Sequence, residues 1–198
     1  EFDEYIYNYY LSRILNITDI FINGHIFEIN QCAHCIRVAQ THNLKFEFGD
    51  PNREQPDFLI NGYGFEITST RYTDASQKSK PSLKVLRKFR EKNKKPYANG
   101  NTILIKDINQ LSYHVYSKSL EVSPTLKEVR QIVANESKFG LVLNFVEWIE
   151  EKDENVFFKG TVYDTYGKNC TAELRSFVNQ YFIKGTHKFT EEIMVSPN

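Results

Sequence analysis

The sequence predicts a single α/β domain over residues 1–198, with a central mixed β-sheet flanked by helices. Two kinds of apolar periodicity interleave along the chain, a helical spacing of three to four residues and a strict alternation typical of strands. No internal repeat, low-complexity tract or long linker divides the chain, and its length suits one substantial core. A sheet covered by helices follows from this interleaving.

The first third of the chain contains two predicted helices and one strand. Apolar residues at helical spacing predict helices over residues 2–17 and 25–42, with a turn at Asn23-Gly24 between them. From Leu44 the period changes to alternation and indicates a strand over residues 44–48, followed by a polar loop over residues 49–55.

The most legible unit is a β-hairpin. Residues 57–60 and 63–67 have strand patterns, and Asn61-Gly62 between them readily takes the positive φ angles that a tight hairpin turn requires. The remaining elements are predicted as a helix that begins at Pro81, helices over residues 124–137 and 172–183, and strands over residues 102–105, 139–149 and 156–163.

Composition excludes several classes of protein. Hydrophobic residues make up 40% and charged residues 25%, as in ordinary globular proteins. No apolar run approaches the roughly 20 residues that cross a bilayer, and the first residues lack the layout of a signal peptide, so we expect a cytoplasmic protein with no membrane partner. Three cysteines do not make a disulfide framework, and Cys32-Ala33-His34-Cys35 is only half of a zinc site.

Two carboxylates are the best candidates for chemistry. Asp57 and Glu66 stand on the two arms of the predicted hairpin, so both can point toward the same end of the sheet. Carboxylate oxygens are ligands that Mg²⁺ prefers, and a metal held there could polarise a phosphodiester and lower the pKa of a bound water. The hairpin therefore predicts a carboxylate metal site.

Pro56-Asp57, a short spacer and Glu66-Ile67-Thr68 resemble the PD-(D/E)xK nuclease superfamily, with its restriction-endonuclease-like fold, over roughly residues 25–105. The resemblance implies a hydrolase, a divalent-metal-dependent endonuclease that uses Mg²⁺ or Mn²⁺. It also implies an auxiliary metal ligand on the preceding helix, for which Glu28 is the candidate and His34 a rival.

The sequence departs from the family pattern at one position, since Thr68 stands where the family has a lysine. Threonine cannot supply the positive charge that stabilises the transition state. Relocated lysines occur in the superfamily, and Lys84 is the first candidate for this role and Lys80 the second.

Positive charge is concentrated between residues 78 and 95, where nine lysines and arginines are opposed only by Glu91, although the net charge of the chain is zero. Such a surface can bind phosphates with release of counterions. We expect it to contact nucleic acid through Lys80, Lys84, Lys88, Lys92 and Lys95. The resemblance to the nuclease superfamily implies DNA slightly more than RNA, and the residues themselves do not decide between them.

Two other functions are compatible with the same residues. One is a non-catalytic nucleic-acid-binding module of the same fold, and the other is a protein-interaction domain whose basic helix binds an acidic partner. The sequence leaves open the strand preference and the oligomeric state, for which a homodimer is one arrangement.

Overall fold

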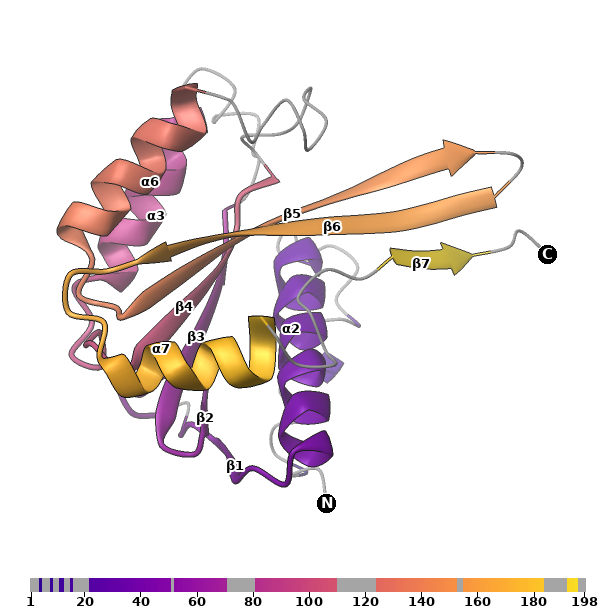
Figure 1. Cartoon of the computed structure of the whole chain (residues 1–198). Helices are drawn as coiled ribbons and strands as arrows, with labels where there is room; N and C mark the ends of the chain where they lie inside the picture. Colours follow the sequence, from indigo (N-terminus) through magenta and orange to yellow (C-terminus); the bar gives the residue numbers. More distant parts are fainter. Residues whose placement is uncertain are drawn as a thin grey trace.

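The computed structural model describes residues 4, 8, 11, 12, 15, 22–50, 52–70, 81–109, 124–152, 155–183 and 192–195 (Figure 1). The helices are α2 (Ile22–Thr41), α3 (Pro81–Lys92), α6 (Pro124–Glu136) and α7 (Ala172–Val178), and a π-helical turn (Asn179–Ile183) continues α7. The strands are β1 (Phe46–Phe48), β2 (Phe58–Ile60), β3 (Tyr63–Ser69), β4 (Thr102–Asp107), β5 (Leu141–Lys152), β6 (Asn155–Tyr166) and β7 (Glu192–Val195). No helix in these ranges is both long and apolar enough to cross a membrane.

The strands form one mixed sheet in the order β1-β2-β3-β4-β5-β6-β7. The β3–β4 and β4–β5 pairs are parallel, and all the other neighbouring pairs are antiparallel. Helices α3 and α6 are the crossover connections between the parallel strands, which cannot be joined by a tight turn. The predicted α/β architecture, a mixed sheet flanked by helices, is confirmed at this level.

The hairpin forms as its turn residues predict. Asn61 has φ 49° and Gly62 has φ 83°, the two positive values of a type I′ turn. The turn sets the register in which Phe58 pairs with Phe65. Continued by one residue, this register places Asp57 opposite Glu66.

Alternate residues of the central strands separate two apolar cores. Ile103 and Ile105 of β4 pack with α2 and α7, whereas Leu104 packs with α3 and α6. Figure 1 shows α3 and α6 together on one side of the sheet and α2 and α7 on the other. Apolar side chains on both faces explain the unbroken apolar run Ile103-Leu104-Ile105 in β4.

Helix α3 packs on the sheet with its apolar face, and a polar contact near each end of the helix also joins it to the sheet. Val85, Leu86 and Phe89 are buried in the core that α3 shares with α6. The Lys106 side chain on β4 donates a hydrogen bond to the carbonyl oxygen of Val85, near the start of the helix, and Lys92 at its end pairs with Glu66. These contacts place α3 antiparallel to β3 and β4.

Several predicted boundaries were wrong. Helix α2 begins at Ile22, so Asn23-Gly24 lies inside it instead of forming a turn. The first predicted strand begins at Phe46, and β7 was not predicted. The predicted helix over residues 2–17 falls mostly outside the described residues, and one domain over residues 1–198 stays a prediction.

We predict that Lys106→Met stabilises the protein at neutral pH. Burial lowers the pKa of Lys106 from 10.5 to about 7, so between these values the unfolded chain binds the proton more tightly and stability rises with pH. Methionine carries no charge and so removes the cost of burying one, but it also loses the hydrogen bond to Val85, which is worth about 1 kcal/mol. We expect a net rise in the free energy of unfolding of about 2–4 kcal/mol at pH 7.

Urea denaturation at pH 6.5, 8 and 9.5 measures the effect of Lys106→Met. The advantage of the variant should shrink steadily as the pH rises. A variant that is less stable than the parent at pH 6.5 would show that Lys106 contributes more by its hydrogen bond than its burial costs.

Candidate functional site

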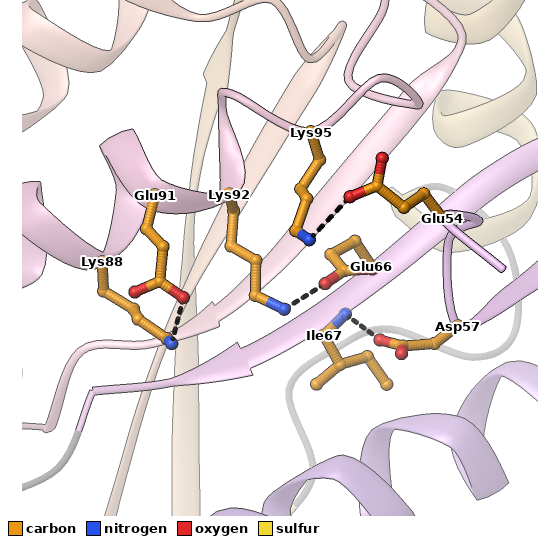
Figure 2. Close-up of polar contacts among 8 residues, drawn as sticks. All are labelled: Glu54, Asp57, Glu66, Ile67, Lys88, Glu91, Lys92 and Lys95. Atoms are coloured by element: carbon orange, nitrogen blue, oxygen red, sulfur yellow. Dashed lines mark hydrogen bonds and ion pairs between the residues drawn. The ribbon is translucent and has the colours of Figure 1, made fainter. Parts of the chain in front are cut away.

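The candidate site lies where the hairpin meets the end of α3 (Figure 2). Glu66 on β3 is 2% exposed, and its carboxylate pairs with the Lys92 ammonium group and accepts a hydrogen bond from Tyr97. Burial raises the pKa of Glu66, and Lys92 and Tyr97 oppose this rise. Burial also disfavours the charged form of Lys92, but Glu66 outweighs this effect and the pKa of Lys92 is raised.

Asp57 is held by the neighbouring arm of the hairpin. The backbone N–H of Ile67 donates to its Oδ2 atom at 2.6 Å. Gly49 brings the preceding loop close, because its N–H donates to the carbonyl oxygen of Asp57 at 2.8 Å and a Cβ there would lie 2.0 Å from the carbonyl oxygen of Pro56. The loop and the hairpin together fix Asp57 beside Glu66.

The two hairpin carboxyl groups differ in what stabilises their charged forms. Burial, followed by the charges of Glu66 and Glu28, raises the pKa of Asp57 well above its ordinary value. Glu66 pairs with a cation and accepts from a hydroxyl group, whereas Asp57 accepts from the backbone N–H of Ile67. Of the two groups, Asp57 is therefore the one whose neutral form its surroundings favour more strongly.

Helix α2 contributes the third carboxyl group and a thiol. Glu28 lies close enough to Asp57 to raise its pKa, and its Oε2 atom is 3.9 Å from Nδ1 of His25. Burial, with Asp57 and Glu28, raises the pKa of the Cys32 thiol to about 12. Cys32 and Cys35 are free and buried, so thiolate chemistry or zinc binding there is disfavoured at neutral pH.

The structure brings Lys92, and not Lys84, to the carboxylates. Lys84 lies more than two turns before Lys92 on α3, about 12 Å along the axis at 1.5 Å per residue, and its nitrogen is buried. Lys80 lies outside the described residues. His34, the rival ligand on α2, is buried.

Tyr97 is the site residue that sequence reasoning missed. It follows α3 in an irregular segment, where no periodic pattern marks its direction. The choice of Lys92 could have been recognised from helical periodicity, because Val85, Leu86 and Phe89 define the buried face and Lys92 lies three residues after Phe89 on that same face.

The described ranges contain no group of three or more His, Cys, Asp or Glu residues that could hold a metal ion. Glu66 is paired with Lys92, and Asp57 accepts from the Ile67 backbone N–H. The predicted Mg²⁺ or Mn²⁺ site with Asp57, Glu66 and Glu28 as ligands is therefore corrected.

Comparisons with known proteins do not establish a family. No family model matches the sequence, and no curated protein matches it. Among solved structures, one weak match is the crystal structure of a S-adenosylmethionine-dependent methyltransferase from Clostridium acetobutylicum ATCC 824, with 10% identity, 96% of this chain and 97% of that chain covered, and a TM-score of 0.23. This TM-score is too low to show a shared fold, so it carries no methyltransferase assignment.

The PD-(D/E)xK resemblance and the functions drawn from it are corrected as well. No family model and no curated protein connects the chain with that superfamily, and the described residues hold no metal-binding group. Membership of that superfamily, a restriction-endonuclease-like fold, the hydrolase activity of a metal-dependent endonuclease and the divalent cofactor are not retained. The two alternative functions find no support in the comparisons either.

We predict that Asp57→Asn stabilises the protein at neutral pH. The folded-state pKa of Asp57 is raised, so its protonated form contributes stability that is lost as the pH rises from 3.8 through the folded value. An amide remains neutral and can still accept from the Ile67 N–H, which should add roughly 1–3 kcal/mol at pH 7. Chemical denaturation at pH 7 and pH 4 should show the gain only at pH 7; a loss at both would mean that Asp57 is ionised.

We also predict strong coupling between Lys92 and Glu66. Lys92→Met leaves the buried Glu66 without its cation and should cost about 3–5 kcal/mol. Glu66→Gln in the same chain removes the orphaned charge and should restore most of that loss. A double-mutant cycle measured by urea denaturation gives the coupling energy, and additive effects of the two substitutions would contradict a buried ion pair.

Proposed function

We propose that this chain binds nucleic acid along one side of α3. The observation that carries the proposal is a cluster of cations on α3 and just after it, which we call the α3 basic face and define as Arg87, Lys88, Lys94 and Lys95. Arg87 and Lys94 are exposed and make no ion pair with a described residue. Exposed cations that the fold does not use are available to phosphate groups.

Other cations of this segment serve the fold. Arg90 makes a two-pronged contact with Glu136 of α6, with Nε–Oε2 and Nη2–Oε1 distances of 2.8 and 2.7 Å. Lys92 is committed to the buried Glu66. The charge excess of residues 78–95 therefore divides into cations that fix α3 and cations that face solvent. Lys92, a predicted contact residue, belongs to the first group.

Lys88 and Lys95 have partners that a phosphate can replace. Lys88 pairs with Glu91 at 2.8 Å, and Lys95 pairs with Glu54 at 3.2 Å, and both glutamates are exposed. Figure 2 shows these two pairs on either side of Lys92. Exposed ion pairs contribute only about 0.2–1 kcal/mol, so exchange of a carboxylate for a phosphate is inexpensive.

The spacing of the basic face suits a strand backbone. Arg87 and Lys88 lie on α3, and Lys94 and Lys95 lie in the turn directly after its last residue, Lys92. The four cations therefore follow one helix and the turn that continues it. A row of separated cations can contact successive phosphates of one strand.

The proposal names a nucleic-acid strand without a preference for DNA or RNA, because the preference for DNA rested on the corrected family resemblance. It includes no cleavage. The roles of Lys80 and Lys84 as contacts, and a homodimer, stay predictions. Fluorescence anisotropy with labelled 20-nucleotide single and double strands of DNA and RNA, over a KCl series, tests the proposal directly. Absence of binding to all four at low salt would overturn it.

We predict that the paired substitution Arg87→Gln and Lys94→Gln weakens binding to every strand that the parent binds. Each phosphate contact contributes about 0.7–0.9 to the slope of log affinity against log salt concentration, so losing both should reduce the slope by about 1.4–1.8. The matched control is Lys45→Gln with Lys168→Gln, which removes two exposed lysines elsewhere. Equal losses in the two double variants would mean that only net charge matters.

A further inference from the structure

Lys106 is a buried basic residue that the proposed function does not use. Its side chain is 1% exposed and lies beneath α3 in the core shared by α3 and α6. The nitrogen donates to the carbonyl oxygen of Val85 and lies 6.0 Å from the centre of the Phe89 ring. Lys106 thus sits directly under the helix that carries the α3 basic face.

The surroundings of Lys106 contain few charges. In register with it are Thr68 on β3 and Asn144 on β5, both uncharged, and the amide of Asn144 donates to the carbonyl oxygen of Tyr163 on β6. The side chains that α6 places in this core are Leu126, Val129 and Val133. The charged groups that act on Lys106 are Lys88 on α3 and Asp107 next to it on β4.

The charge of Lys106 responds to the charge on the surface above it. Burial is the main reason why the pKa of Lys106 falls to about 7, Asp107 opposes the fall, and the positive charge of Lys88 adds to it. Both protonation states are therefore populated near neutral pH. Lys88 belongs to the α3 basic face, so its positive charge interacts with any anion that binds there.

We propose that binding of a nucleic-acid strand to the α3 basic face is coupled to uptake of a proton by Lys106. A phosphate beside Lys88 cancels the positive field that disfavours the ammonium form, so the bound state holds the proton more tightly. Because linkage is reciprocal, protonation of Lys106 raises the affinity for the strand by the same factor. The coupling rests on the proposed function and adds a dependence on pH to it.

The hydrogen bond to Val85 allows this change without moving α3. A neutral amine and an ammonium group can both donate to a carbonyl oxygen, so the contact persists in either state. The coupling is therefore electrostatic, and its size is set by the field across the buried face of α3. A modest effect is expected, a few tenths of a proton per bound strand near pH 7.5.

Isothermal titration calorimetry with a 20-nucleotide oligothymidylate tests the proposal, because thymine does not titrate near pH 7. Measurement at pH 7.5 in Tris and in HEPES, which differ in ionisation enthalpy, gives the protons taken up. We expect uptake by the parent chain and an affinity that rises about 2–4-fold between pH 8.5 and 6.5. Lys106→Met should bind with an unchanged salt slope and without the part of the uptake that belongs to Lys106.

Lys88→Gln is the second variant and keeps Lys106 in place. It should bind more weakly and take up fewer protons than the parent, because the charge through which the strand acts on Lys106 is gone. Equal proton uptake in the parent and Lys106→Met, or binding without any uptake in the parent, would overturn the coupling and leave nucleic-acid binding intact. No binding by the parent at any pH would overturn both proposals.

Discussion

The position of α3 is the constraint on which the rest of the site depends. An apolar face alone can slide along a sheet, but Lys106 holds the first part of the helix through Val85, and Glu66 holds its last residue, Lys92. Two polar contacts at opposite ends define both the direction and the depth of the helix. Because these contacts on the buried side fix α3, they also determine where its exposed cations lie.

The two inward lysines meet the cost of burial in different ways. Lys92 keeps its charge because a buried carboxylate faces it, whereas Lys106 has only a carbonyl oxygen, an aromatic ring and a neighbouring aspartate and loses its charge readily. Asp57 follows the second course, because burial raises its pKa and favours its neutral form. Titratable groups beneath α3 and at the hairpin thus have pKa values that differ from the ordinary values of their residue types.

Much of the architecture could be predicted from periodicity, since the Asn61-Gly62 turn and the alternation of β3 are local signals. The site was harder, because its geometry depends on how α3 crosses the sheet. Sequence reasoning placed Lys84 near Glu66 because Lys84 is closer along the chain, but the antiparallel course of α3 brings Lys92 there instead. Two acids in a hairpin are too short a pattern to establish a family.

Strand β5 continues past the end of its pairing with β4. β4 pairs with β5 from Leu141 to Phe145, and within the described residues the backbone from Val146 to Lys152 has no partner on that side. An unpaired edge of this kind invites self-association. The sequence of this stretch includes Glu147, Glu150 and Glu151, and negative charge along an edge opposes the pairing of two copies, so protonation of these glutamates in acid should weaken that protection.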